Sequence, residues 1–180
     1  MQLARRCGAV PIMLMLTACS SAPTLPVAEN VDLDRFMGDW YVIANIPTFI
    51  EKGAHNAIES YKLAEDGTIE TTFTFRADNF DGEPKRYTPR GFVQDKASNA
   101  VWGMQFLWPF KSDFRIVYLT PDYTQTVIGR EKRDYVWIMA RTPSIPDTEY
   151  AGIVEFLGRQ GYDVTQIQKV PQRWPAAQGG

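Results

Sequence analysis

The chain has 180 residues, which is enough for one well-buried domain and short for two. Its composition is that of a globular protein, with 44% hydrophobic, 22% charged and 13% aromatic residues and a formal net charge of −2. Nucleic-acid binding requires a concentrated basic face, whereas Lys and Arg are scattered among acids here, so we predict no nucleic-acid partner.

Residues 1–18 are predicted to be an export signal. A basic start precedes an apolar stretch over 9–16, and small residues follow it. This order is typical of a secretory signal, and the stretch is too short to span a bilayer as a mature helix. The run 16–19, Leu-Thr-Ala-Cys, resembles a bacterial lipoprotein box, which implies cleavage before Cys19 and acylation of that cysteine. An ordinary secretory signal cleaved near Ala18 or Ala22 is the alternative.

Cysteine usage agrees with acylation. Cys7 would leave with the signal, so Cys19 would be the only cysteine of the mature chain. A free thiol is prone to oxidation in an oxidising compartment, and acylation of the cysteine removes the free thiol. Ser20 rather than Asp follows Cys19, which by resemblance to enteric-type lipoproteins implies sorting to the outer membrane. Residues 19–32 are predicted to be the lipidated N-terminus and a tether, because this segment is rich in Ser, Ala, Pro and Val.

From residue 33 the pattern changes to short runs of alternating apolar residues, which are typical of β-strands. The segment 65–67, Glu-Asp-Gly, is a strong hairpin turn signal between two of these runs. Strands at such short spacing favour a sandwich or an up-and-down barrel over a parallel sheet. The eight predicted strands are 40–44, 57–63, 68–76, 86–94, 100–107, 114–120, 125–130 and 134–141.

One helix is predicted after the strands. It begins at Pro146-Asp147 and ends before Gly161, and its apolar residues fall at helical spacing on one face. We expect this stripe to pack on the rest of the domain. A short ninth strand is predicted over 164–170, and a flexible tail over 172–180. The apolar stripe of the helix consists of Tyr150, Ile153, Val154 and Leu157.

Three regions carry a resemblance to a known family. Gly38 and Trp40 stand at the start of the first strand in a Gly-x-Trp motif. Asp122 and Tyr123 lie in the turn between the sixth and seventh strands, and Arg141 ends the last barrel strand. Taken in order with the late helix, these motifs resemble those of the lipocalins, and of the bacterial lipocalins in particular. The turn departs from the usual spacing, since the Tyr directly follows the Asp.

The resemblance implies an all-β fold for residues 33–171. This is an eight-stranded antiparallel up-and-down β-barrel, with one C-terminal α-helix packed outside and a short ninth strand. It also implies that the three motif regions meet at the closed end. A guanidinium on the face of Trp40 gains a cation–π contact of about 0.5–2 kcal/mol, and its N–H groups can donate to carbonyls of the closing segment. Trp40 and Arg141 are therefore expected to seal the floor rather than to bind a ligand.

Side chains alternate across a strand, so each run has an inner and an outer set, although a bulge would invert it. An eight-stranded barrel either fills itself with side chains or holds one small ligand. The large inward aromatics could simply fill the barrel, whereas the small inward residues Ala44, Ala57 and Gly91 leave space, and Met and rings suit an apolar guest. The resemblance carries most of the choice, and it implies a hollow cup. The candidate ligand contacts are Glu59 as a polar contact, and Tyr61, Phe73, Phe75, Trp102, Met104, Phe106, Phe114, Tyr118, Trp137 and Met139.

The resemblance implies a carrier of fatty acids or lysophospholipids, anchored in the bacterial outer membrane with its domain facing the periplasm. No catalytic residue, metal site or cofactor is predicted. His55 is the only histidine and lies in a loop, and the acidic turn 78–83 lacks the ligand spacing of a calcium loop. Phosphate-loop, zinc and nucleophile-elbow motifs are missing from the sequence.

Two other functions stay open at this point. A filled barrel would suit a non-catalytic envelope interaction or structural lipoprotein. A lipocalin-fold enzyme acting on an apolar substrate would need a reactive side chain in the cavity. The sequence leaves open whether the chain forms a homodimer.

Overall fold

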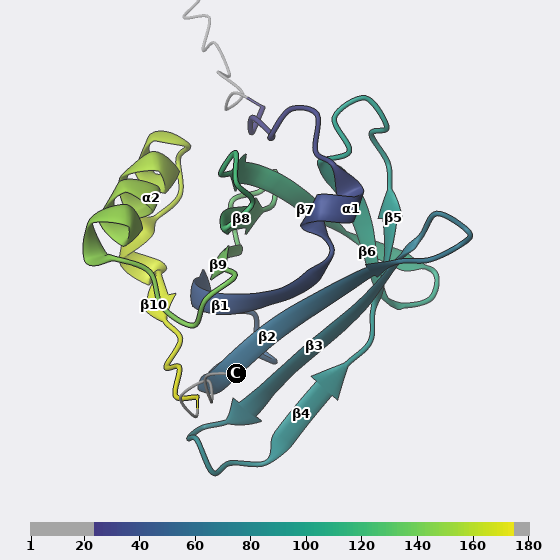
Figure 1. Cartoon of the computed structure of the whole chain (residues 1–180). Helices are drawn as coiled ribbons and strands as arrows, with labels where there is room; N and C mark the ends of the chain where they lie inside the picture. Colours follow the sequence, from purple (N-terminus) through teal and green to yellow (C-terminus); the bar gives the residue numbers. More distant parts are fainter. Residues whose placement is uncertain (1–23, 175–180) are drawn as a thin grey trace, which may run out of the picture.

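A computed structural model describes residues 24–174 (Figure 1). The predicted signal peptide, Cys19 and the last residues, 175–180, lie outside the described part. Ten strands form one antiparallel sheet, which closes into a barrel because the first long strand pairs with the ninth. The strands are β1 (Gly38–Ile46), β2 (Ala54–Leu63), β3 (Ile69–Ala77), β4 (Pro84–Tyr87), β5 (Arg90–Val93), β6 (Val101–Leu107), β7 (Phe110–Leu119), β8 (Gln125–Gly129), β9 (Val136–Ala140) and β10 (Gln168–Lys169).

The predicted strand 86–94 is in fact two strands. β4 and β5 both pair with β3 and are separated at Thr88 and Pro89. The reason is local: proline has no N–H to give to a ladder, so a strand breaks or reaches an edge there. Because β4 and β5 share one position beside β3, the barrel has eight strand positions, as the resemblance implied.

Two bulges change which face some residues occupy. The register of β1 against β9 shifts between Val42 and Ala44, and Ala44 packs outside the barrel, not inside it as expected. The register of β7 against β8 shifts between Ile116 and Tyr118. Ile116 points inward, whereas Val117 and Tyr118 both pack on the outer face. An extra residue on one strand puts two consecutive side chains on the same side, which inverts the alternation beyond it.

The helix α2 (Asp147–Arg159) lies outside the barrel (Figure 1). Its buried residues, Ile153 and Leu157, belong to the predicted stripe and pack with outward-facing strand residues such as Val127 and Ile138. The chain leaves the helix through Gly161, whose φ of +88° is the left-handed conformation that ends many helices. The helix therefore covers one outer face of the barrel and leaves the lumen free.

Part of the predicted tether is packed against the barrel. Leu25 and Val31 are fully buried, and the backbone N–H of Ala28 donates to Ile116 O at 2.8 Å. A short helix, α1 (Leu33–Phe36), follows and was not predicted. The side chain of Asp32 caps it by accepting from Arg35 N. The described residues 24–32 thus belong to the folded domain.

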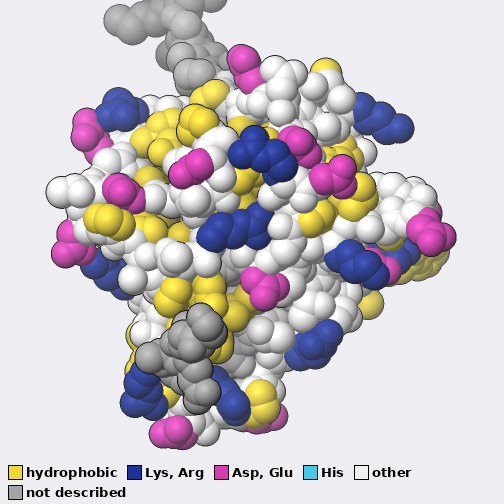
Figure 2. Space-filling view, in the orientation of Figure 1, with side chains coloured by type: hydrophobic (Ala, Val, Ile, Leu, Met, Phe, Trp, Pro, Cys, Tyr) yellow, Lys and Arg dark blue, Asp and Glu magenta, His cyan; other side chains and the backbone are white. Residues whose placement is uncertain are grey.

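The C-terminal segment also differs from expectation. Instead of a strand over 164–170, the chain makes a 3-10 turn, η1 (Val164–Gln166), and then the two-residue β10, which pairs with β1. Gln172, which falls in the predicted tail, donates from Nε2 to Val42 O at 2.8 Å and to Ala57 O at 3.1 Å. Acidic and basic side chains are interspersed over the face shown in Figure 2. Within residues 24–174, no helix is both long and apolar enough to cross a membrane.

Candidate functional site

Arg141 organises one end of the barrel, which is closed. Its Cζ lies 3.7 Å from the centroid of the Trp40 ring, and the Trp40 indole donates to Phe36 O at 2.9 Å. The guanidinium also donates to Asp39 O and Met37 O, each at 2.8 Å. Arg141 therefore ties the start of β1 to α1, in the structural role that the resemblance implied.

The turn after β7 joins the same closed end. The backbone N–H of Asp32 donates to the Tyr123 hydroxyl at 2.9 Å, and Arg35 Cζ lies 4.0 Å from the centroid of the Tyr123 ring. Asp122 instead accepts hydrogen bonds within its own turn. Those from Thr120 and Thr124 hold its pKa below the usual range. Gly38 completes this end: its φ is +96°, and a Cβ there would lie 3.3 Å from Arg141 Nη1.

Aromatic rings fill the closed half of the barrel. Phe36 lies 5.1 Å from Trp40 and 5.6 Å from Tyr61, measured between ring centroids. Trp102 lies 5.7 Å from Tyr61 and stacks on Phe114 at 5.0 Å. Such tilted, edge-on and offset arrangements are the favoured geometries of aromatic pairs. We refer to these rings as the aromatic plug, which makes the closed half of the barrel a solid core.

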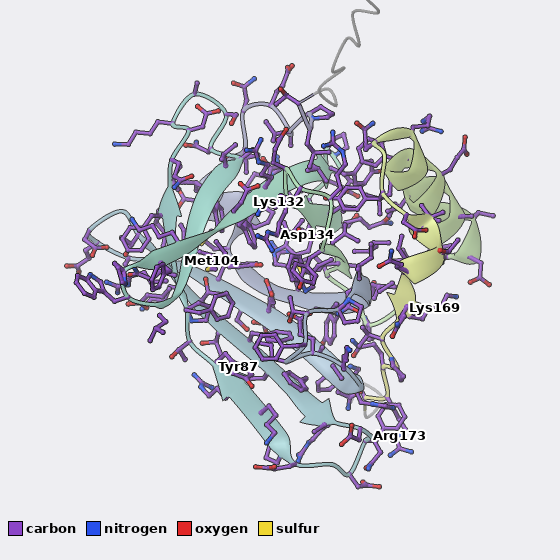
Figure 3. The ribbon with its side chains drawn as sticks, turned by 180° about the vertical axis from the view of Figure 1, so that it is seen from behind. Tyr87, Met104, Lys132, Asp134, Lys169 and Arg173 are labelled. Atoms are coloured by element: carbon purple, nitrogen blue, oxygen red, sulfur yellow. The ribbon has the colours of Figure 1, made fainter. Side chains whose placement is uncertain are left out.

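Above the plug lies a cavity of about 540 Å³. This volume falls within the roughly 300–1,000 Å³ of small-molecule sites. Figure 3 shows the protein from the side opposite to Figure 1. It labels Met104 on β6, Tyr87 on β4, and Asp134 in the β8–β9 loop at the open end of the barrel. The cavity is lined by Thr48, Phe49, Ile50, Glu51, Glu59, Thr71, Phe73, Tyr87, Thr88, Pro89, Met104, Phe106, Ser112, Asp113, Phe114, Arg130, Tyr135 and Trp137.

Glu59 is a carboxyl group inside this lumen. It lies on β2 opposite Phe73 and accepts a hydrogen bond from the Tyr61 hydroxyl. Burial raises its pKa to about 7, the Tyr61 hydrogen bond opposes that rise, and the charge of Glu51 adds to it. Burial and the Glu59 charge likewise raise the pKa of Tyr61 well above its ordinary value. Glu59 therefore exchanges its proton near neutral pH, while Tyr61 stays a hydrogen-bond donor.

Glu51 is a second carboxyl group at the cavity and fixes the β1–β2 loop. Its Oε2 accepts from Trp137 Nε1 at 2.7 Å and from Asn45 Nδ2 at 3.0 Å, and its Oε1 accepts from Thr48 Oγ1 at 2.9 Å. Burial raises the pKa of Glu51, although these three hydrogen bonds oppose the rise. The carboxyl group holds the indole of Trp137 in a fixed position on the cavity wall.

Two polar atoms of the lining lack a hydrogen-bond partner within residues 24–174. These are Thr71 Oγ1 and Arg130 Nε. Arg130 Nη1 lies 3.3 Å from Asp134 Oδ2, so its guanidinium is only partly satisfied. Buried polar groups normally find a partner, so these two atoms are exceptions within the described part of the chain. The described residues contain no cluster of His, Cys, Asp and Glu arranged to hold a metal.

Sequence comparison places this barrel in a family. The sequence model described as a lipocalin-like domain matches residues 31–172. The chain is a member of the lipocalin family. It is 30% identical over 170 residues to the outer membrane lipoprotein Blc of Citrobacter freundii, covering 92% of this chain and 94% of that protein. It is 31% identical to temperature-induced lipocalin-1 of Arabidopsis thaliana, covering 82% of this chain and 83% of that one.

Solved structures agree on the fold of this lipocalin. Insecticyanin from the tobacco hornworm superposes with a TM-score of 0.65 at 14% identity, covering 87% of this chain and 88% of that one. At that identity the likeness concerns the fold alone. Proteins of the lipocalin family generally bind and transport ligands rather than catalyse reactions.

The cavity of this lipocalin brings together six of the eleven candidate contacts. Tyr61 and Trp102 instead belong to the aromatic plug, and Phe75 and Met139 are buried without lining the cavity. Tyr118 is on the outer face, 5.6 Å from Phe156 of α2 between ring centroids, because of the β7 bulge. The six that line the cavity are Glu59, Phe73, Met104, Phe106, Phe114 and Trp137.

Sequence reasoning missed several polar residues of the site. Glu51 and Arg130 come from loops at the open end, where no periodicity marks an inward side chain. Thr71 is on the side of β3 that alternation predicts to face inward, with Phe73, but it was not counted among the candidate ligand contacts. His55 lies outside the cavity lining, where it contacts Gly53 O at 2.9 Å and packs edge-on against Phe80.

Proposed function

We propose that this lipocalin carries a single-chain lipid, a lysophospholipid or a fatty acid, by reversible binding in the open-end cavity. The observation that carries the proposal is the lumen of about 540 Å³, open at one end, with an aromatic and Met wall above a sealed floor. Burial of an acyl chain contributes about 0.8 kcal/mol per methylene. Association costs cancel a large part of that gain, which leaves an affinity of roughly micromolar order.

The charges of the lumen favour entry of the acyl chain first. Glu51 and Glu59 are carboxyl groups within the cavity, and an anionic headgroup beside them would be desolvated and repelled. A headgroup that stays at the mouth avoids both costs and lies near the guanidinium of Arg130, a lining residue from the β8–β9 loop. Phosphate and carboxylate are the groups that a guanidinium binds best.

We propose that the protein is an outer membrane lipoprotein, the setting that the name of one relative states. The Blc protein of Citrobacter freundii is called an outer membrane lipoprotein. With the Leu-Thr-Ala-Cys run, this supports acylation of Cys19 and a lipid-anchored domain that faces the periplasm. The protein would then store or hand on lipids within the cell envelope, without catalysis.

Lipid extraction tests the proposal directly. We expect mass spectrometry of an organic extract of the purified protein to find lysophospholipid or fatty acid in amounts comparable to the protein. Titration of lipid-free protein with lysophospholipid should quench the fluorescence of Trp137, which stands on the cavity wall. An extract without lipid, together with unchanged fluorescence and melting temperature, would support a non-carrier lipoprotein instead.

A paired substitution locates the binding site. Thr71→Phe is expected to weaken lysophospholipid binding by at least about tenfold, because the ring would occupy volume that the acyl chain needs. Thr72→Phe is the matched control, since Thr72 is the next residue of the same strand and faces outward. Titration calorimetry should show near wild-type affinity for the control. Equal affinities for both variants would place the lipid elsewhere.

Lipid affinity is expected to depend on pH. An acyl chain in the cavity displaces water from Glu59 and so favours its neutral form. The affinity should therefore fall as pH rises through about 7, the pKa of Glu59, by up to about tenfold per pH unit. Titrations on both sides of neutrality would measure this, with Glu59→Gln as a control whose affinity loses that dependence. An affinity that rises with pH would contradict the assignment of Glu59 to the lipid-contacting wall.

A further inference from the structure

Large apolar side chains project into solvent at the open end. The turn between β6 and β7 carries Leu107, Trp108 and Phe110, which are 71%, 79% and 73% exposed. Phe49, in the β1–β2 loop, is 84% exposed. Soluble monomers seldom expose a group of large apolar residues at one end, and such patches mark contacts with proteins, membranes or ligands. We refer to these four residues as the apolar rim.

The apolar rim is continuous with the lipid cavity. Phe49 belongs to both, since it lines the cavity and projects into solvent. Phe106, the neighbour of Leu107, also lines the cavity and is 54% exposed. An acyl chain leaving the lumen between Phe49 and Phe106 would therefore pass over apolar side chains.

The charges beside the rim suit a bilayer surface. Residues 104–112 contain no acid, and their one charged residue is Lys111, whose Nζ lies 3.6 Å from the centroid of the Phe92 ring. Lys52 is exposed in the same loop as Phe49. Trp with a nearby Lys is the combination that sits at the level of lipid headgroups, with the ring in the apolar layer and the amine in water. The nearest acid along the hairpin, Asp113, is bound to Arg115 at 3.0 Å.

The N-terminal segment leads toward the same end of the barrel. Val31 N donates to Ser98 O in the β5–β6 loop of the closed end. Leu25 N, by contrast, lies 3.2 Å from Glu131 Oε1 in the β8–β9 loop of the open end. Cys19 precedes Leu25 by 25 − 19 = 6 residues, which can span at most about 20 Å. An anchor on Cys19 therefore holds the open end within that reach of the bilayer.

We infer that the apolar rim docks the mouth of the barrel onto the bilayer that carries the anchor. Single-chain lipid then passes between membrane and cavity without crossing open water. The identity of the lipid rests on the proposed function, whereas the docking itself does not.

A site-specific label tests the docking. The acylated mature protein, from which the signal with Cys7 has been removed, is reconstituted in vesicles of phosphatidylethanolamine and phosphatidylglycerol. Because Cys19 is blocked by acylation, Leu107→Cys provides a single site for an environment-sensitive dye. Lys96→Cys, in the exposed β5–β6 loop of the closed end, is the matched control. Quenching by lipids with brominated acyl chains and by aqueous iodide is measured for both.

We expect the dye at position 107 to be quenched severalfold more by brominated lipid than the dye at 96, and severalfold less by iodide. Trp108→Gln, added to Leu107→Cys, should reduce the lipid quenching severalfold, because it removes the largest rim side chain. Equal lipid quenching at both positions would overturn the proposal. Protection of position 107 from iodide without lipid quenching would overturn it too, and would indicate a second copy of the chain on the rim.

The result of the docking experiment is independent of the result of the lipid-extraction test of the proposed function. Intact-protein mass spectrometry reports acylation of Cys19, and lipid extraction reports the cargo. Neither reading depends on where the dye lies, so docking without cargo and cargo without docking are distinct results.

Discussion

Arg141→Ala is expected to lower the melting temperature by about 6–12 °C, the shift that a loss of about 3 kcal/mol produces in a domain of this size. The substitution removes the cation–π contact with Trp40, worth about 0.5–2 kcal/mol. It also removes charge-assisted hydrogen bonds, worth about 1.5–3 kcal/mol each in favourable cases. The accepting carbonyls belong to Arg35, Phe36, Met37, Asp39 and Tyr123.

Arg141→Lys separates charge from geometry. Lysine keeps the positive charge but lacks the planar fork that reaches several carbonyls at once. We expect it to recover only part of the lost stability, as measured by thermal unfolding followed by circular dichroism. Lysophospholipid affinity measured well below the melting temperature should change little in either variant, because Arg141 lies at the closed end. A melting point equal to that of the wild type in Arg141→Ala would refute the stacking argument.

Glu59→Gln is expected to stabilise the protein at about pH 8 by up to about 3 kcal/mol and to have little effect at about pH 4. The pKa of Glu59 is raised from 4.5 to about 7 on folding. The folded state therefore binds more protons than the unfolded state between these values. Unfolding free energy must then fall as pH rises across that interval and level off above it, where Glu59 is ionised in both states.

Glutamine removes that ionisation and can still accept the hydrogen bond from Tyr61. Denaturant unfolding at several pH values measures the effect. Glu51 contributes a slope of the same sign, since its pKa is also raised, so some pH dependence should persist in Glu59→Gln. Glu65→Gln, in the exposed β2–β3 turn, is the matched control. A wild-type pH slope in Glu59→Gln would show that this carboxyl group is not the source.

The fold was accessible from the sequence because most strands alternate as an ideal pleat does. β3 and β6 were placed to within one residue, and their inward sides were assigned as the structure has them. The errors have identifiable causes. Ala44 and Tyr118 lie beyond bulges, whose extra residue leaves no mark in hydrophobicity. The break at Pro89 could have been predicted from proline chemistry.

The site was less accessible than the fold because loops complete it. Glu51 and Arg130 face the cavity through the paths of the β1–β2 and β8–β9 loops, which depend on tertiary contacts rather than on period. The buried Leu25 and Val31 were similarly hidden, as isolated apolar residues in a segment that otherwise reads as a tether. Alternation also cannot show how far a plug such as the one around Trp102 extends into the lumen.

The pairing of β1 bears on how the barrel assembles. β1 pairs with β2 only over 38–41, and beyond that stretch it pairs with β10 at Ala44 and Asn45. Its other edge joins β9, which lies about a hundred residues later in the chain. Contacts of such long sequence separation form slowly, and an unpaired strand edge invites association with other chains. Closure must therefore wait until β9 has been made, so the free edge of β1 has to be shielded while the intervening strands are synthesised.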